Sequence, residues 1–369
     1  MAGSTVTYVT QTELGVDPGV QKLDPAVKAA LFGALDSDGV YDVPYPAEDG
    51  KIAWIQEGDY PGGQPAPFIQ IRETTNSVNI TTDAALKAII MNDTGLTGHE
   101  LDISGGKNDL FVAMGTGADT VKLFDKGNDT VYAGNGGDSI DASASSGNDS
   151  LVGGTGNDTI YGGTGHDMLV GGGGHNQLHS GSTKAGEFNV LYGGSGMDTL
   201  YGGGGADSLY GGSGQETLIA GAGKHQWLQA GSGNTLLEDT VAASGGTDTL
   251  IGGAGNDTII GQQGDFLKDT GGSQNTFWLY GTGHGNSTLQ GATGNDTFNI
   301  ETNSGNDTII GGGGSDTVNL DHRAFTDLKD IKINGASNYT LDFKDGQKVT
   351  VDHISDIHFA NDSVDLKLP

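Results

Sequence analysis

From residue 101 to residue 320, single apolar side chains recur at intervals of about nine residues, each flanked by polar or small residues. Such a segment predicts a three-residue strand whose middle side chain points inward and whose two neighbours point outward. The expected inward residues are all apolar, which supports the chosen register. They are Phe111, Val121, Val131, Ile140, Leu151, Ile160, Leu169, Leu178, Leu191, Leu200, Leu209, Leu218, Trp227, Leu236, Leu250, Ile259, Phe277, Leu289, Phe298, Ile309 and Val318.

The residues between these strands complete a nonapeptide, Gly-Gly-x-Gly-x-Asp-x-apolar-x. Full matches begin at Gly153, Gly162, Gly193, Gly202, Gly252 and Gly311. In substituted units the sixth position is held by Asn176, Asn189, Glu216, His225, Asn234, Asn275 or Asn286. A short fixed period predicts a solenoid in which two units make one coil, hence roughly 11 coils with parallel strands. Insertions fall near 181–186 and 238–245, and the register is lost around 262–269.

Composition divides the chain into three regions. Residues 1–100 contain few glycines, and we expect a small N-terminal α+β region there, with short helices at 24–35 and 84–91 and strands at 68–72 and 77–80. Residues 101–320 form the repeat array. Residues 321–369 alternate apolar and polar positions around a turn at Asp345-Gly346, which predicts a β cap. The expected fold class is all-β, a parallel β-roll (a β-solenoid of nonapeptide repeats) with a C-terminal β cap.

The turns must contribute to stability, because one apolar residue in nine makes a thin core. Glycine accounts for 67 of 369 residues, and glycine-rich turns cost the most backbone entropy to order. There are 47 Asp and Glu against 17 Lys and Arg, a formal net charge of −30. Inward carbonyl oxygens and Asp carboxylates are hard ligands that suit several Ca²⁺ ions. We therefore expect a calcium-stabilised roll in which ion binding and folding are one equilibrium.

The same composition excludes several partners and compartments. A surface this negative argues against nucleic acid and anionic membrane, and no apolar run approaches the ~18 residues of a membrane span. There is no Cys for disulfides or thiolate metal sites. The first 17 residues lack a basic start followed by an apolar stretch. We expect a cytosolic protein or one exported by a route that does not read the N-terminus.

The tandem nonapeptides resemble the RTX family, the hemolysin-type calcium-binding repeats of bacterial proteins. The tail TVDHISDIHFANDSVDLKLP (350–369) is similar to the segment that closes many of them. This resemblance implies an uncleaved C-terminal signal that is read by type I secretion machinery. It also implies a chain that is unfolded in low-calcium cytosol and folds outside the cell.

The expected calcium ligands are sixth-position carboxylates and the backbone of the first and third positions in full repeats. The carboxylates belong to Asp109, Asp119, Asp129, Asp138, Asp149, Asp158, Asp167, Asp198, Asp207, Asp248, Asp257, Asp296, Asp307 and Asp316. The backbone positions are Gly153, Thr155, Gly162, Thr164, Gly193, Ser195, Gly202, Gly204, Gly252, Ala254, Gly311 and Gly313. The alternative is a calcium-free β-helix in which the Asp residues only form turns, but the full glycine pattern and the charge favour calcium.

Two further surfaces have alternative interpretations. In substituted units the Asn residues weaken a calcium site or form a metal-free Asn ladder, and we favour the ladder for Asn176, Asn189, Asn234, Asn275 and Asn286. At the outward ninth position, Tyr161, Tyr192, Tyr201 and Tyr210 could form a ligand-binding or assembly face. Packing between neighbouring strands is the simpler interpretation. Outward Thr residues at the seventh position would suit an ice-binding face, but Thr also favours strands in general.

Motifs of the enzymes most often attached to RTX repeats are missing. His99-Glu100 lacks the second His of a metalloprotease, and Ser195 and Ser213 stand in turns without a nucleophile elbow. His166 and His175 should fall on opposite edges, which argues against a zinc site. We therefore expect no catalytic activity.

The sequence thus favours a secreted calcium-binding structural protein that self-assembles as a surface-layer, matrix or filament subunit. The two ends of a solenoid expose strand edges that template assembly unless they are capped. The expected partners are further copies of the chain and the type I secretion machinery, with a polysaccharide or a cell surface as a further partner. The alternatives are a carbohydrate-binding or adhesive module, an enzyme of unrecognised type in residues 1–100, and an ice-binding protein.

Overall fold

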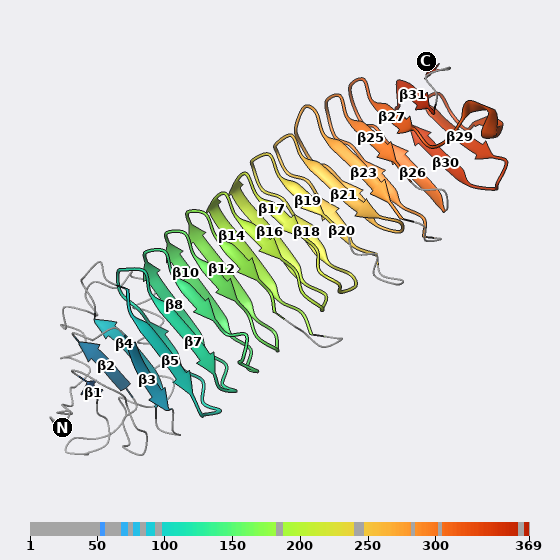
Figure 1. The fold of residues 1–369 in the computed structure, drawn as a ribbon. Coiled ribbons are helices and arrows are strands. Elements are labelled where there is room, and N and C mark those ends of the chain that lie inside the picture. The colour runs from blue at the N-terminus through green and yellow to red at the C-terminus, as the bar shows by residue number, and fades with distance from the viewer. Residues whose placement is uncertain are drawn as a thin grey trace. The chain divides into compact units, whose positions relative to one another are not determined.

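The computed structural model describes residues 52–55, 68–72, 77–81, 86–92, 98–181, 187–239, 247–281, 285–301, 305–360 and 365–368. The chain divides into two compact units, Met1–Lys184 (unit 1) and Ala185–Pro369 (unit 2). The described residues form strands and one short 3₁₀ helix, with no α-helix among them (Figure 1). The expected all-β class is confirmed.

Unit 1 is a parallel β-solenoid whose strands alternate between two sheets. Sheet A1 contains β1 (Ile52–Ile55), β2 (Phe68–Arg72), β4 (Ala88–Asn92), β6 (Phe111–Ala113), β8 (Thr130–Asn135), β10 (Ser150–Thr155) and β12 (Met168–Gly173). Sheet B1 contains β3 (Ser77–Thr81), β5 (Glu100–Ser104), β7 (Thr120–Phe124), β9 (Ser139–Asp141), β11 (Thr159–Tyr161) and β13 (Gln177–His179). Parallel pairing therefore extends upstream of residue 101 to β1.

Unit 2 repeats this arrangement with two parallel sheets of its own. Sheet A2 contains β14 (Val190–Gly196), β16 (Ser208–Gly214), β18 (Trp227–Gln229), β20 (Thr249–Ile251), β22 (Phe266–Lys268), β24 (Thr288–Gln290), β26 (Asn306–Ile310) and β30 (Lys348–Asp352). Sheet B2 contains β15 (Thr199–Tyr201), β17 (Thr217–Ile219), β19 (Leu236–Glu238), β21 (Thr258–Gln262), β23 (Thr276–Tyr280), β25 (Thr297–Ile300), β27 (Thr317–Leu320) and β31 (Asp356–Phe359).

The C-terminal segment of unit 2 ends the parallel pairing with antiparallel strands, as expected of a β cap. The 3₁₀ helix η1 (Phe325–Asp327) leads into β28 (Leu328–Ile333), which pairs with β29 (Asn338–Phe343), and β29 pairs with β30. On the other sheet, β32 (Asp365–Lys367) pairs antiparallel with β31. The turn between β29 and β30 contains Asp345 and Gly346, and Gly346 has φ +96°, which the sequence anticipated.

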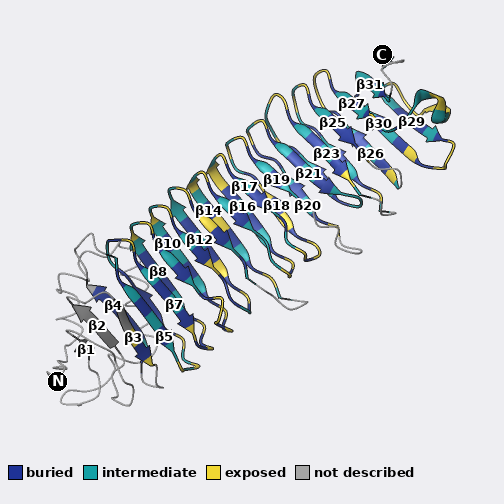
Figure 2. Cartoon of the chain, viewed as in Figure 1, coloured by how far each residue is buried: buried dark blue, intermediate teal, exposed yellow. Residues whose placement is uncertain are grey.

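The core of each unit is a stack of single side chains, one from each strand. In unit 1, Leu151 lies between Val131 and Leu169 in sheet A1, and all three are fully buried. Figure 2 shows buried residues along the strands and exposed residues mainly in the turns. From Phe111 to Leu320, the described A strands number four in unit 1 and seven in unit 2, and the described B strands have the same numbers. These eleven pairs confirm the expected number of coils.

The inward register is wrong at three of the expected positions. Trp227 is 38% exposed and Leu236 is half-buried, whereas Leu228 and Leu237 take the inward places. Phe111 pairs with Thr130, so Val112 is the inward residue of β6. In each case two adjacent apolar residues made the choice of the inward one ambiguous, and the sequence placed it one residue early.

The expected helix at 84–91 is also wrong where the structure describes it, because β4 occupies Ala88–Asn92 and pairs with β2 and β6. Its apolar residues are buried on both faces, with Ile89 and Ile90 fully covered. A strand that is buried on both faces is apolar at every position, and a buried helix can have the same apolar run. Periodicity alone could therefore not distinguish the two. The expected helix at 24–35 lies outside the described residues.

Candidate metal-binding edges

Each unit has two edges, defined by the direction of the turn. Turns from a B strand to the next A strand lie on the BA edge, and turns from an A strand to the next B strand lie on the AB edge. The full repeats that begin at Gly153, Gly193, Gly252 and Gly311 form AB turns, with Thr155, Ser195, Ala254 and Gly313 at their third positions. Those that begin at Gly162 and Gly202 form BA turns, with Thr164 and Gly204 at their third positions.

The sixth-position side chains are buried under the turns of both edges, each at most 3% exposed. On the BA edge they are Asp129, Asp149, Asp167, Asn189, Asp207, Gln226, Asp248, Asp265, Ser287 and Asp307. On the AB edge they are Asp119, Asp138, Asp158, Asn176, Asp198, Glu216, Thr235, Asp257, Asn275, Asp296 and Asp316. Burial of so many carboxylates is unfavourable unless charge or hydrogen bonds compensate for the lost water.

One oxygen of these carboxylates is used in a ladder between coils. The backbone N–H at the sixth position of one coil donates to Oδ1 at the sixth position of the next coil. Examples are Asp129 to Asp149 and Asp138 to Asp158, both at 2.8 Å. Asn275 fills the same role, since its Oδ1 accepts from the N–H of Asp257 at 2.9 Å. The ladder works equally well with an amide oxygen, which supports the ladder interpretation for Asn176 and Asn275.

A second ladder joins the fifth positions and runs the other way. There the N–H of a later coil donates to the side-chain oxygen of the earlier coil, as from Asn148 to Asn128 and from His166 to Asn148, both at 2.8 Å. Asn234 and Asn286 belong to this exposed ladder and accept from Asn256 and Asn306. Asn at the fifth position therefore has a structural role that the sequence pattern did not reveal.

The other carboxylate oxygen is the candidate metal ligand. Oδ2 of Asp129, Asp138, Asp149 and Asp316 is buried and accepts no hydrogen bond. Elsewhere this oxygen accepts a backbone N–H of its own turn, as Asp167 does from Gly163 at 2.8 Å. Buried carboxylate oxygens without a donor fit a bound hard cation, which Ca²⁺ is.

The electrostatics of the buried carboxylates agree with this fit. Loss of water raises the pKa of Asp129 to about 9, of Asp138 and Asp269 to about 7, and of Asp149 and Asp248 to about 6. Neighbouring carboxylates add to each rise. The same burial raises the pKa of Asp125, Asp257, Asp265 and Asp316. The ionised edges therefore need a compensating positive charge.

The first-position glycines stand where two oxygen atoms converge. A Cβ on Gly311 would lie 2.3 Å from Oδ2 of Asp316 and 2.3 Å from the carbonyl oxygen of His353. On Gly153 it would lie 2.3 Å from Oδ2 of Asp158 and 2.8 Å from the carbonyl oxygen of Gly171. Any larger residue would fill the space between these oxygens. The glycines thus keep a carboxylate and a carbonyl of the next coil open to a common ion.

Two of the third-position carbonyls, those of Thr155 and Gly313, accept a hydrogen bond from a backbone N–H of a neighbouring coil. Thr155 O accepts the N–H of Gly136 at 2.7 Å, and Gly313 O accepts that of Gly294 at 2.5 Å. A carbonyl oxygen has two lone pairs, so one stays available for a cation.

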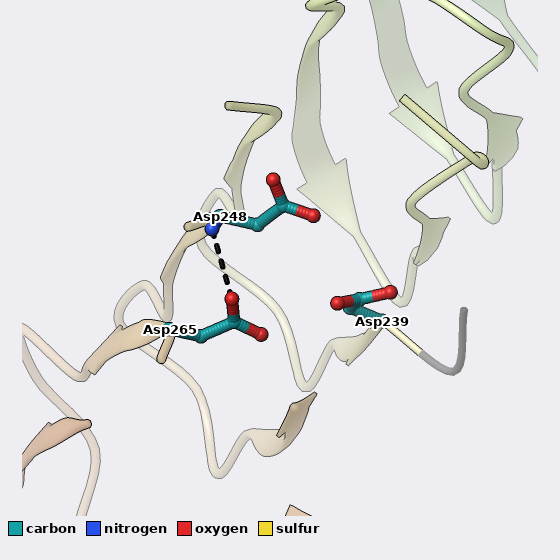
Figure 3. A group of neighbouring side chains, drawn as sticks. All are labelled: Asp239, Asp248 and Asp265. Atoms are coloured by element: carbon teal, nitrogen blue, oxygen red, sulfur yellow. Dashed lines mark hydrogen bonds between the residues drawn. The ribbon is translucent and has the colours of Figure 1, made fainter. Parts of the chain in front are cut away.

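An irregular part of unit 2 gathers three carboxylates that the nonapeptide pattern did not group. Asp239, Asp248 and Asp265 are buried, and one oxygen of each lies within 4.8 Å of the others (Figure 3). That spacing lets one ion contact all three at the 2.3–2.6 Å usual for Ca²⁺–oxygen distances. The N–H of Asp248 also donates to Oδ1 of Asp265 at 2.8 Å.

At other turns a side-chain amide occupies the oxygen-rich space. Nδ2 of Asn275 lies 2.9 Å from Oδ2 of Asp269, 3.0 Å from Oδ1 of Asp296 and 3.1 Å from the carbonyl oxygen of Gly271. Nε2 of Gln263 similarly donates to the carbonyl oxygen of Gly285 and to Oδ1 of Asp307. These amides donate hydrogen bonds to oxygen atoms that would otherwise face a cation.

Sequence reasoning misplaced some edge residues and missed others. Asp109 is exposed and stands in the fifth-position ladder, where it accepts from Asn128 at 2.8 Å, while Leu110 is buried at the sixth position. Gln226, Thr235 and Ser287 take the sixth positions assigned to His225, Asn234 and Asn286. The buried carboxylates missed are Asp125, Asp239, Asp265 and Asp269. The only available signal for these residues was an Asp close to a short strand.

Comparison with known families identifies these edges. The family model described as RTX calcium-binding nonapeptide repeat (4 copies) matches residues 125–145, 143–178, 192–224, 236–265 and 299–321. The chain belongs to the RTX calcium-binding repeat family. The expected cofactor is thereby confirmed, because RTX nonapeptides bind several Ca²⁺ ions in each array. A search of curated proteins returned no match.

Membership of the RTX family also bears on where the chain acts. RTX proteins are secreted, typically by type I machinery, and the family indicates an extracellular protein here. Among the described residues, no helix is long and apolar enough to span a membrane.

His166 and His175 lie in a BA turn and an AB turn respectively, on opposite edges as expected.

The four expected face tyrosines of this RTX chain are divided among three sheets. Tyr192 and Tyr210 stack on each other in sheet A2, with ring centroids 5.1 Å apart. Tyr161 in sheet B1 stacks on His179 at 4.6 Å. Tyr201 lies in sheet B2 beside Ile219. Cross-strand packing thus accounts for three of the four rings.

Proposed function

We propose that this RTX chain is an extracellular structural protein that folds when it binds calcium and then self-associates. The observation that carries the proposal is the set of buried edge oxygens without hydrogen-bond donors, such as Oδ2 of Asp138 and Asp316. An ionised carboxylate buried without a partner costs several kcal/mol. The chain therefore stays unfolded at low calcium, a state suited to export, and folds where calcium is abundant.

We infer that the ligands are the sixth-position carboxylates with the backbone carbonyls of the first and third positions. Bound calcium would supply the positive charge that these turns lack. The carboxylates of Asp239 and Asp265 join the expected Asp248 in this role, because all three can reach one ion. Asp109 does not take part, because it is exposed and serves the fifth-position ladder.

Self-association is proposed through the ends of the solenoid units. In unit 2, β28 pairs only with β29 among the described strands, so its outer edge is available for pairing. Ile333 at the end of β28 is 72% exposed, the highest value among the exposed large apolar side chains of the described residues. In unit 1, β1 pairs only with β2 among the described strands, so its other edge is also available for pairing. Calcium assists by reducing the repulsion between copies of charge −30.

Sedimentation velocity during a calcium titration tests this proposal. We expect compaction of the chain, followed by a concentration-dependent rise to large species. The Ile333→Glu variant should compact normally but assemble at higher protein concentration. Met197→Glu is the matched control, because Met197 is also exposed (51%) but lies in a turn away from the cap. A single rise that stops at a compact monomer would refute self-association.

A carbohydrate-binding role is the second candidate, and one observation favours it. Tyr192, Tyr210 and Trp227 lie on neighbouring strands of sheet A2, with Tyr192 41% and Trp227 38% exposed. Aromatic side chains on a flat sheet suit sugar rings. Retention of the calcium-loaded monomer on a polysaccharide column, abolished in a Tyr192→Ala/Tyr210→Ala variant, would support it.

A further inference from the structure

Strand β28 is the last strand of the cap sheet in unit 2, and its apolar side chains are only partly covered. In the antiparallel pair with β29, Ile331 lies opposite Leu341 and Ile333 lies opposite Tyr339. Directly opposite residues share a face of the sheet, so both isoleucines stand on the face where Leu341 and Tyr339 are buried. Ile331 is nevertheless only half-buried, and Ile333 is 72% exposed. Among the described residues, the inner face of the cap therefore ends in apolar surface that remains open.

The backbone groups of β28 alternate between β29 and the free edge. The N–H of Asn334 donates to the carbonyl oxygen of Asn338 in the opposite strand at 2.9 Å, so the even-numbered residues of this stretch face β29. The N–H and carbonyl groups of Ile331 and Ile333 then point to the free edge. The N–H of Ile331 indeed donates to a side chain of its own strand, Oδ1 of Asp330, at 2.9 Å. A further strand would thus pair with the odd-numbered residues.

Charge decides in which register a second copy of β28 can pair with the first. In an antiparallel two-fold pair, the free-edge groups meet only when odd-numbered residues lie opposite odd-numbered ones. A pair centred on Asp330 sets this residue opposite itself, and a pair centred on Lys332 does the same with Lys332. Both registers place like charges directly opposite, which is unfavourable. A pair centred on Ile331 instead sets Asp330 opposite Lys332 twice, and registers centred further along overlap fewer residues of β28.

Asp330 and Lys332 are available for such a pairing. Both are exposed, and the ion pair printed for this strand joins the neighbouring Lys329 to Asp342 at 3.2 Å. Asp330 lies opposite Asp342 in the sheet, so it has a like charge on one side. Lys332 of a second copy would stand on its other side and offset that repulsion.

We propose that two copies of the chain join through β28 in an antiparallel two-fold pair that is centred on Ile331 and held by two Asp330–Lys332 ion pairs. The N–H of Ile331 then donates to the carbonyl oxygen of Ile331 in the second copy, and Asp330 exchanges its backbone contact for Lys332. The two A2 sheets become one continuous sheet, with the isoleucines of both copies together on its inner face.

An interface of this kind uses the same surface on both copies and closes at two. The inference rests on the proposed self-association. It adds the partner strand, the register and a dimer as the first species to form. Larger species need a second contact, such as the free edge of β1 in unit 1.

Sedimentation velocity of calcium-loaded charge-reversal variants tests the ion pairs. Asp330→Lys and Lys332→Asp each set like charges opposite each other twice, and each should weaken dimerisation about tenfold. An equimolar mixture of the two variants should restore it, because every Lys then faces an Asp of the other variant. Lys224→Asp is the matched control, since it makes the same charge change at an exposed position in the turn between β17 and β18. Single variants that dimerise like the wild type, or a mixture that stays monomeric, would overturn the proposal.

Single-cysteine cross-linking locates the two-fold axis without changing a charge, and the wild-type chain contains no Cys. In the proposed pair, the Cα atoms of residue 331 in the two copies lie about 5.5 Å apart. Those of residue 333 lie about 13 Å apart along the strands. A short bifunctional thiol reagent should therefore link Ile331→Cys into a dimer and leave Ile333→Cys unlinked, although Ile333 is the more exposed. Any other pattern would overturn the register.

Failure of this pairing is distinguishable from failure of the proposed function. A wild-type chain that stays a compact monomer in calcium would refute self-association itself. A wild type that assembles, with charge-reversal variants that assemble equally well, would refute only the pairing through β28.

Discussion

The backbone N–H of Asp129 donates a hydrogen bond to Oδ1 of Asp149 in the next coil, at 2.8 Å. One residue earlier the direction reverses, because the N–H of Asn148 donates to Oδ1 of Asn128 at the same distance. Neighbouring coils are thus tied in both directions without metal. At Asp129, Asp138, Asp149 and Asp316 the sixth-position ladder leaves Oδ2 without a hydrogen-bond donor and so available to calcium. Turn geometry and ion binding therefore share the same side chains.

The fifth-position ladder should contribute to stability independently of calcium. Asn148→Ala removes the acceptor for the N–H of His166, and we expect a loss of about 0.5–1.5 kcal/mol in the free energy of unfolding. Urea unfolding in saturating calcium measures it. Asn148→Asp keeps the acceptor and is the control. Equal losses in both variants would show that the hydrogen bond is not the cause.

The first-position glycine should be needed for its lack of a side chain. In Gly153→Ala the new Cβ would lie 2.3 Å from Oδ2 of Asp158, so the turn must shift at a cost of about 1–3 kcal/mol. Calcium affinity should fall with it. Gly313→Ala is the control, because its Cβ would meet no atom closer than 4.0 Å. The Tm of each variant is measured at several calcium concentrations. A Gly153→Ala variant whose Tm equals that of the wild type at every calcium concentration would contradict this role of Gly153.

The amide of Asn275 should replace a cation. Asn275→Asp removes the Nδ2 donor from beside Asp269 and Asp296 and adds a charge. We expect a lower Tm at low calcium, and a Tm that rises more steeply with calcium than in the wild type. Asn306→Asp makes the same change at an exposed ladder position and should not alter the slope. Equal slopes in the two variants would refute this role of Asn275.

Acid should partly substitute for calcium. The pKa values of Asp129 (about 9), Asp138 (about 7) and Asp149 (about 6) are raised in the fold above their unfolded values, so the folded state binds protons more tightly. Its stability therefore increases as pH falls from about 9 towards 4, where the unfolded carboxylates also protonate. Circular dichroism in calcium-free buffer should show more β-structure at pH 5 than at pH 8. The opposite trend would contradict the assigned burial.

The repeat pattern was sufficient to predict the class, the coil number and most of the core, since each strand has one apolar residue between polar neighbours. It failed where adjacent apolar residues offered two registers, as with Trp227 and Leu228 or Phe111 and Val112. Asp265 and Asp239 were not predicted as buried edge carboxylates, because an insertion and a short turn interrupt the nine-residue spacing. Asp125 and Asp269 escaped because their burial depends on packing between coils, which no single turn encodes.

Far-UV circular dichroism of the chain at pH 7.5 measures the dependence of folding on calcium. We expect an unfolded spectrum in chelator and a cooperative change to a parallel-β spectrum as calcium is added, reversed when chelator is restored. A β-rich spectrum in chelator that calcium leaves unchanged would contradict it, because the buried edge carboxylates would then need no cation.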